Sequence, residues 1–314
     1  KTHGDISSLA ISVAGVLDTG SESNEGGGKS TDFTGAGSGS GNTVTNTTLA
    51  EIRTGGNVQA DTDAVGGGDV LLSAVDDTTL TADSGGAALG IITGGGSGDS
   101  GTLIALGASI AINAVDTIVR AKVSDSVISG GSLTLNANNA QTIDALTLAG
   151  AFSIATDGST AFGGAGSGSG NDIDSTIEAI IDPSTVTTTG NVLVSASDDS
   201  DITSDAGSAA LSVTTGGTDS VTAVAVGAAA ATNDIANHTR AAIEDSTVSA
   251  GGSVTVQADS TATIDTFAFG FAGSVAAGDN GTTALAGAGS GSGNYIANTI
   301  EAVIAGSNVT SGGA

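Results

Sequence analysis

The sequence contains no cysteine, methionine or tryptophan, and it has only one proline, one tyrosine and six phenylalanines among 314 residues. A compact globular domain of this length normally draws much of its core from Leu, Met and aromatic side chains, which fill a wide interior. The chain has instead 51 glycines and many Ala, Ser, Thr, Val and Ile residues, and 39% of its residues are apolar. β-Branched residues favour strands, and so much apolar sequence argues against disorder. The composition predicts a folded, β-rich protein with a narrow interior.

Basic residues are also scarce, because six Lys and Arg stand against 33 Asp and Glu, for a formal net charge of −27. Nucleic-acid binding needs clustered Lys and Arg, so this charge excludes it, and it disfavours docking on anionic lipid. No apolar run reaches the roughly 18 residues of a membrane helix, so we expect no direct membrane insertion. An acidic chain without thiols is typical of proteins in salty, oxidising surroundings. We therefore expect an extracellular or cell-surface location.

An octapeptide, Gly-Ala-Gly-Ser-Gly-Ser-Gly-Asn, occurs at residues 35–42, 164–171 and 287–294. Its closing asparagine belongs to a regular series of five: Asn42, Asn113, Asn171, Asn233 and Asn294. Self-similarity at a fixed period is the signature of a stacked repeat architecture. We therefore divide the chain into half-repeats of about 61 residues, of two alternating kinds. Their boundaries are 1–41 (partial), 42–112, 113–170, 171–232, 233–293 and 294–314 (partial).

Within a half-repeat the hydrophobic period is two, as in Val254-Thr255-Val256-Gln257-Ala258, which predicts half-buried strands. Gly-Gly, Asp-Ser and Asn interrupt these runs about every ten residues, as turn residues do. Short strands and stacked repeats predict an all-β fold, a parallel β-solenoid. With about 20 residues a coil, each half-repeat would form three coils and the chain a rod of about 15 coils, about 70 Å long. Tandem β-sandwich domains are the alternative, although they usually contain a buried Trp or a Cys pair.

The repeat pattern also suggests a family. Its elements are Asn298-Thr299-Ile300, the segment 308–313 and the strand pattern of residues 253–264. They resemble the repeats of very large bacterial surface proteins, the filamentous-haemagglutinin-like and leukotoxin-like adhesins. The resemblance covers nearly all the chain and implies a secreted, right-handed β-helix on a bacterial surface, without carrying over any binding residue. Because residues 308–314 match 247–253, where the earlier copy continues into a strand, we expect a segment of something longer or a subunit completed by its neighbour.

The two kinds of half-repeat differ at alternate positions before the closing asparagine. One kind has a comb of glycines at these positions, which loses packing and is entropically unfavourable in a strand. A bulky neighbour such as Phe267, Phe269 or Phe271 could fill the space, or the backbone of another copy could approach it. The second possibility would place lateral contacts six coils, or about 29 Å, apart. The candidate assembly residues are Gly37, Gly39, Gly41, Gly166, Gly168, Gly170, Gly289, Gly291 and Gly293, where the other kind has Ala108, Ile110 and Ile112 or Ala228, Ala230 and Thr232.

Acidic residues recur at the corresponding positions of two half-repeats, where we place turns. Clustered carboxylates on a turn can bind Ca²⁺, the one possible cofactor that the sequence suggests, and solvated turn acids are the simpler interpretation. The candidate metal ligands are Asp76, Asp77, Asp198, Asp199 and Asp201.

Catalytic residues are not identifiable in this sequence. The only histidines are His3 and His238, and His238 occupies the position that Ile118 has in the preceding matching copy. Arg120 and Arg240 recur in register, which predicts ladder or turn contacts rather than a unique catalytic base. The insertion at residues 61–68 is the one place where the repeat is irregular.

We therefore predict a structural, non-enzymatic segment of an extracellular bacterial filament or giant surface adhesin. It would be a stiff scaffold that associates with itself end to end, and laterally through the glycine combs. A repeated module that binds surface glycans or Ca²⁺ is the alternative function, and a polysaccharide-acting β-helix enzyme is the third.

Overall fold

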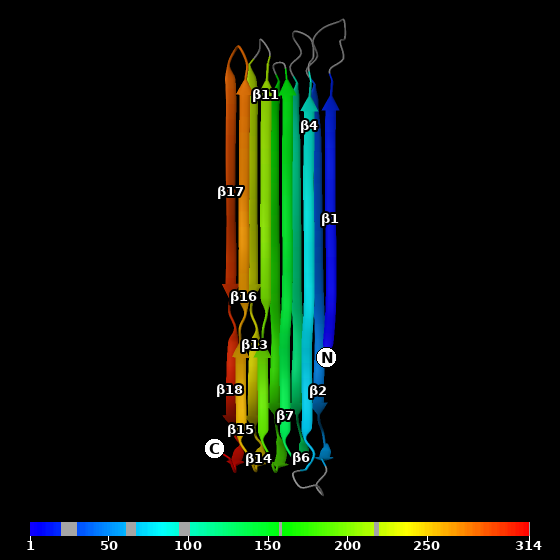
Figure 1. Ribbon diagram of the computed structural model, residues 1–314, viewed down its shortest axis with the longest axis vertical. Helices are drawn as coiled ribbons and strands as arrows, with labels where there is room; N and C mark the ends of the chain where they lie inside the picture. The colour runs from blue at the N-terminus through cyan, green and yellow to red at the C-terminus, as the bar shows by residue number, and fades with distance from the viewer. Residues whose placement is uncertain (20–29, 61–66, 94–100, 157–158, 217–219, 314) are drawn as a thin grey trace.

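The computed structural model describes residues 1–19, 30–60, 67–93, 101–156, 159–216 and 220–313. These residues form β-strands and turns, and none of them belongs to a helix that could cross a bilayer. The strands lie side by side along one long axis, with the chain progressing from one edge of the array to the other (Figure 1). The molecule is therefore long in the direction of its strands.

Three parallel sheets make up the fold, and we call them the A, B and C sheets. The A sheet contains β1 (Thr2–Asp18), β4 (Val70–Ile92), β7 (Leu133–Thr156), β10 (Val192–Asp198), β11 (Asp201–Thr215), β15 (Val254–Ser260) and β16 (Thr263–Ala277). The B sheet contains β2 (Thr31–Ile52), β5 (Thr102–Val123), β8 (Thr160–Ile181), β12 (Val221–Ile235), β13 (His238–Glu244), β17 (Thr282–Ile296) and β18 (Thr299–Ala305). The C sheet contains β3 (Asn57–Gln59), β6 (Ser126–Gly130), β9 (Ser184–Thr188), β14 (Thr247–Ala250) and β19 (Asn308–Ser311).

One pass through the A, B and C sheets is one coil, and the chain makes five such coils. Coils 1, 2 and 3 begin with β1, β4 and β7, and in coils 4 and 5 the A and B strands are each divided in two. Every strand pairs in parallel with its equivalent in the next coil, so that Ile6, Leu80 and Ile143 are neighbours across three coils. The parallel β-solenoid is confirmed, and the tandem sandwiches do not form.

The predicted coil length is wrong, because one half-repeat of about 61 residues forms a single coil rather than three. The cause is that the A and B strands run for up to 24 residues, straight through residues that usually mark turns. Asn113 and Asn171 lie in the middle of β5 and β8 and pair with each other there. Five coils at about 4.8 Å span about 24 Å, whereas the longest strands span about 75 Å. The long dimension therefore follows the strands and not the axis along which coils stack.

The interior changes in width along the strands. Next to the C sheet, three sheets enclose a core of large aliphatic side chains, among them Leu133, Leu135, Ile177, Ile181 and Ile243. At the other end the A and B sheets pack directly on each other, and the buried clusters there consist of alanines, except where Ile92 and Leu103 join Ala155 and Ala161 near the strand ends. We call these two regions the wide end and the narrow end.

At the narrow end the two backbones are in contact. A Cβ atom added to Gly86 would overlap the carbonyl oxygen of Ala108, and one added to Gly107 would overlap that of Gly150. Gly227 and Gly270 meet the opposite sheet in the same way. Close packing of this kind leaves room mainly for Gly, Ala and Ser between the sheets, and no aromatic side chain is buried there among the described residues.

This close approach predicts opposite results for two Gly→Ala substitutions. Gly107→Ala should lower the free energy of unfolding by about 1 to 3 kcal/mol, because the backbone of Gly150 cannot give way. Gly166→Ala is the matched control, since a Cβ atom there meets nothing within 4 Å, and it should be neutral or slightly stabilising. Denaturant unfolding followed by circular dichroism measures both. Equal destabilisation by the two variants would contradict the narrow interior.

Candidate functional site

An asparagine ladder crosses all five coils inside the solenoid, between the narrow and wide ends. Its members are the five asparagines of the repeat series, which occupy one register row of the B sheet. Each side-chain amide donates to the oxygen of the next asparagine, at 3.1, 2.7, 2.7 and 2.9 Å in coil order. Asn42 also donates to the backbone oxygen of Thr81, and Asn294 accepts from Thr266. The ladder therefore connects the B sheet to the A sheet, and all its amide hydrogen bonds are donated from one coil to the next coil in chain order.

Both ends of the ladder are open among the described residues. In coil 1 the side-chain oxygen of Asn42 accepts no hydrogen bond, and in coil 5 the side-chain amide of Asn294 donates none. One end coil thus presents an acceptor and the other a donor.

Asp76 and Asp198 are buried inside the solenoid, which corrects their placement at solvated turns. Their exposed fractions are 0% and 2%. Asp198 accepts hydrogen bonds from Asn139 and Ser200 on one oxygen and from Asn237 and Ser260 on the other, at 2.6 to 3.0 Å. Asp76 accepts from Asn46 and Thr78. They lie inside because the alternation of inward and outward residues continues past both of them, within β4 after Asp76 and from β10 into β11 after Asp198.

The other three candidate metal ligands lie outside and do not join the buried pair. Asp77 is near Lys1 and His3, Asp199 accepts from Thr261 at 2.8 Å, and Asp201 accepts from Thr263. No three His, Cys, Asp or Glu side chains of the described part of the chain form a group that could hold a metal ion. The sequence pattern suggested one acidic turn, whereas the strand alternation sends neighbouring acids to opposite faces.

Ion pairs connect the coils on the outer face of the B sheet near the wide end. In one register row Arg120, Glu178, Arg240 and Glu301 follow one another from coil 2 to coil 5. Arg120 contacts Glu178 at 2.6 Å, and Arg240 contacts Glu301 at 3.3 Å and Glu244 at 2.5 Å. The hydrogen bond to Glu244 raises the pKa of the Arg240 guanidinium. The expectation of ladder contacts for both arginines is confirmed.

Neither histidine forms a catalytic group with its neighbours. His238 lies half-buried in the row of Ile118 and Thr176, at 3.7 Å from Glu301, and His3 lies beside Asp5 and Asp77. Residues 61–66 of the insertion lie outside the described residues, so its predicted irregularity is not described.

The glycine combs face outward on the B sheet. The Ala and Ser residues between them, such as Ser167 and Ser169, face the interior. Around Gly37, Gly166 and Gly289 a Cβ atom would meet nothing within 4 Å. The three phenylalanines proposed to fill this space lie on the outer face of the A sheet instead. Combs in coils 1, 3 and 5 leave grooves about 9.6 Å apart, not 29 Å, because each half-repeat is one coil.

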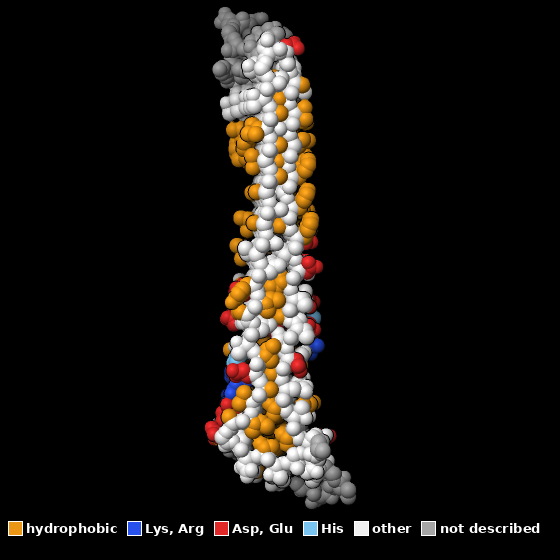
Figure 2. All heavy atoms as spheres, turned by 90° about the vertical axis from the view of Figure 1, so that its left-hand side faces the viewer, with side chains coloured by type: hydrophobic (Ala, Val, Ile, Leu, Met, Phe, Trp, Pro, Cys, Tyr) orange, Lys and Arg blue, Asp and Glu red, His pale blue; other side chains and the backbone are white. Residues whose placement is uncertain are grey.

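The outer face of the A sheet is apolar at the narrow end. We call it the A face and define it by the outward-facing residues of segments 11–17, 85–91, 148–154, 207–213 and 269–275. Its side chains include Ile11, Leu148, Phe152, Phe269 and Phe271, each at least 40% exposed. In Figure 2 hydrophobic side chains project from both flanks of the upper part, while charged side chains gather lower down. Sequence analysis missed this face because alternation alone does not reveal which side is buried.

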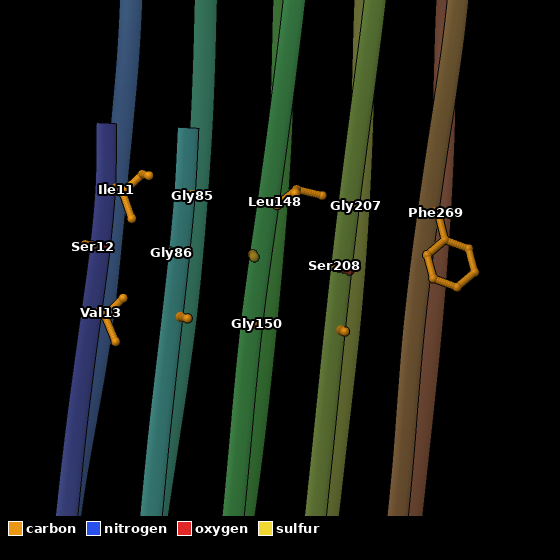
Figure 3. A pocket seen from close by; sticks show the side chains of 13 residues that line it. Ile11, Ser12, Val13, Gly85, Gly86, Leu148, Gly150, Gly207, Ser208 and Phe269 are labelled. Carbon is orange, nitrogen blue, oxygen red and sulfur yellow. The ribbon is translucent and has the colours of Figure 1, made fainter. Parts of the chain in front are cut away.

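A shallow hollow lies on the A face in the two rows nearest Asp83 and Asp205, those of Ile11 and Val13. Figure 3 shows Ile11, Leu148 and Phe269 projecting from the first, third and fifth strands, with Gly85 and Gly207 on the strands between them. Bulky and absent side chains thus alternate from coil to coil along this row.

No protein-family model matches the sequence, and no characterised protein or solved structure is significantly similar to the chain.

The asparagine ladder yields a stability prediction. Asn171→Ala removes both the acceptor for Asn113 and the donor for Asn233, leaving two buried amide groups unpaired. It should lower the free energy of unfolding by about 2 to 4 kcal/mol, measured by denaturant unfolding. The control is Thr176→Ala, because Thr176 lies on the outer face of the same strand. This variant should change the free energy of unfolding by less than about 0.5 kcal/mol. Equal losses would show that the ladder contributes nothing specific.

Stacked carboxylates on the B sheet yield a pH prediction. Burial raises the pKa of Asp172 above its ordinary value of 3.8, and the charges of Asp234 and Asp174 raise it further. At pH 7 the folded chain therefore holds an unfavourable ionised carboxylate. The ionised carboxylate lowers the free energy of unfolding at pH 7. This lost stability is regained as the pH falls from the raised pKa towards 3.8, because the folded chain binds the proton first, and below 3.8 the unfolded chain binds it as well.

Asp172→Asn should accordingly raise the melting temperature at pH 7, with a gain that disappears below about pH 4. Asp259→Asn is the control, because its neighbour in the preceding coil is the neutral Ser197. A gain at Asp172 that is constant with pH, or one matched at Asp259, would contradict the electrostatic origin.

Proposed function

We propose that this chain is a structural scaffold segment of an extracellular bacterial filament or giant surface adhesin, and that its coils continue by stacking edge to edge. The observation that carries the proposal is the coil-to-coil ladder, which leaves complementary groups open on the two end coils. The resemblance to giant adhesin repeats and the net charge of −27 support the location, since an acidic surface keeps such a scaffold dispersed in salty water.

Edge strands with free backbone groups are templates for further pairing. Coil 1 offers β1 and β2, which span 17 and 22 residues, and coil 5 offers β16 and β17. If coil 5 of one copy pairs with coil 1 of another in the register that the existing coils use, Asn294 meets Asn42. The free amide of Asn294 then donates to the free oxygen of Asn42, so the ladder continues.

This junction also avoids opposing like charges. By the same register Glu301 would lie beside Leu49, Asp265 beside Ser7, and Ser260 beside Thr2. Like charges directly opposite each other on neighbouring strands are destabilising, and here Glu301 and Asp265 each meet a neutral side chain. A second copy or further coils of the same pattern fit the edge equally well.

Direct measurements distinguish the alternative functions from that of a scaffold. A Ca²⁺-binding module predicts that Ca²⁺ raises the melting temperature and that chelator reverses the effect, and a glycan-binding module predicts retention on immobilised polysaccharide. In the described residues, no three candidate ligands converge, and the oxygens of Asp198 already accept from four donors. No specific contact favours either module or an enzyme.

Asn294→Asp tests edge-to-edge stacking. The variant keeps a side-chain oxygen for Asn233 and Thr266 but replaces the outward donor with an acceptor, which would face the oxygen of Asn42. Electron microscopy of the unsubstituted chain at high concentration should show ribbons with strands across the ribbon axis and a spacing of about 4.8 Å along it. Asn294→Asp should weaken this association at least about tenfold, a change of about 1.4 kcal/mol.

Asn308→Asp is the matched control, because it adds the same charge to the same coil outside the ladder. Ribbons that form equally well with both variants, or a chain that stays monomeric at every concentration, would refute stacking through the ladder.

A further inference from the structure

We propose that the A face binds the A face of a second copy of this chain, forming a two-fold dimer. This contact goes beyond edge-to-edge stacking, because it uses a broad face of the solenoid rather than an end coil. The four outer rows of the A face contain Gly, Ala, Val, Ile, Leu and Phe and no charged or polar side chain.

The exposure of this face is unusual for such an acidic chain. Ile11, Val13 and Leu17 are 69%, 77% and 65% exposed, and Leu148 is 53% exposed. A soluble monomer rarely exposes a contiguous apolar patch larger than a few hundred Å², and larger patches mark interaction surfaces. The acidic residues that border the face, Asp83 and Asp205, lie in the next row along the strands, so water and charge are confined to its rim.

The area of the face fits a dimer. The symmetry described below pairs coils 2 to 5, whose four strands at about 4.8 Å give a width of about 19 Å, and four rows give a length of about 27 Å. Two such areas together amount to about 1,000 Å², which is about the smallest size of a specific interface. A second copy seated on coils 2 to 5 therefore supplies about the minimum contact of a specific dimer.

The shape of the first row of the face is complementary to itself. In coil order one row reads Ile11, Gly85, Leu148, Gly207 and Phe269, so large residues and glycines alternate. A two-fold axis parallel to the strands, between coils 3 and 4, pairs coil 3 with coil 4 and coil 2 with coil 5. Leu148 then faces Gly207, and Phe269 faces Gly85, as isologous symmetry requires.

This arrangement fills the hollow seen in Figure 3. Phe269, which stacks on Phe267 with ring centroids 6.4 Å apart, would enter the space above Gly85 in the partner. Although this contact lies at the border of the interface, an aromatic side chain that fills a pocket in the partner buries a large apolar area. A lipid surface is the competing occupant, but it offers no such pattern, and the net charge of −27 opposes anionic membranes.

The test compares matched aspartate substitutions on opposite faces. Leu148 on the A face and Ile110 on the B sheet are both 53% exposed and lie in adjacent coils. Each substitution is made in the Asn294→Asp chain, so that edge-to-edge stacking does not contribute. Sedimentation velocity over a concentration series measures the dimer dissociation constant, and circular dichroism verifies that each variant is folded.

We expect Leu148→Asp to raise this dissociation constant at least about tenfold and Ile110→Asp to leave it unchanged. Gly85→Leu, which fills the hollow, should also weaken the dimer, because a Cβ atom there meets only Ile11 at 3.9 Å in its own chain. Gly39→Leu on the comb is its control.

Three results would overturn the proposal. The first is a monomeric Asn294→Asp chain at every concentration, and the second is equal weakening by Leu148→Asp and Ile110→Asp. The third is flotation of the chain with neutral phosphatidylcholine vesicles that Leu148→Asp abolishes while the chain is monomeric in solution, which would assign the face to lipid. Ribbon growth by the Leu148→Asp chain with an intact Asn294 shows separately whether edge-to-edge stacking holds.

Discussion

In-register parallel stacking is the constraint on which the rest of this structure depends. Each residue lies about 4.8 Å from its equivalent in the next coil, so any side chain placed once in the repeat meets its own kind unless the sequence alternates. For asparagine this is favourable, because an amide donates on one side and accepts on the other. For charged residues it is unfavourable. The two alternating kinds of coil avoid this in one row by placing Arg120 and Arg240 beside Glu178 and Glu301, whereas Asp172 and Asp234 remain opposite each other.

The narrow interior has a second consequence for where large residues go. Between the A and B sheets at the narrow end, Gly86 and Gly107 bring backbone against backbone, and Leu103 is buried only beyond them, near the strand ends. Most large apolar residues of this half therefore lie on the outside, where a globular domain would have polar ones. Acidic residues balance this exposure by gathering beyond the apolar rows, as Asp83, Asp172 and Asp205 do. The exposed A face is thus a direct product of the Gly, Ala and Ser interior.

The fold class, the period and the residues that stack could all be predicted from the sequence, because alternation and self-similarity are local signals. The coil length could not. Asn171 and the comb glycines are turn residues by propensity, and tertiary hydrogen bonding holds them within a 22-residue strand. The burial of Asp76 and Asp198 was missed because paired Asp residues are typical of turns, and the donors that satisfy Asp198, such as Asn139 and Asn237, come from other strands. The A face was missed because its strands have Ala and Ser inside and Leu and Phe outside, so hydrophobicity indicates the wrong side of the strand.

The long strands give this fold broad sheet faces and a short stack of coils. Each coil uses about 61 residues to extend the stack by about 4.8 Å, whereas its two long strands each span about 75 Å. Short coils would give a longer stack for the same number of residues, as a spacer requires. The long strands of this chain give instead two broad sheet faces. Edge-to-edge stacking and A-face pairing act along perpendicular directions, and together they would build a two-layered ribbon. The A faces would then be internal, and the B sheet with its charged rows would remain in water, where the net charge of −27 keeps neighbouring ribbons apart.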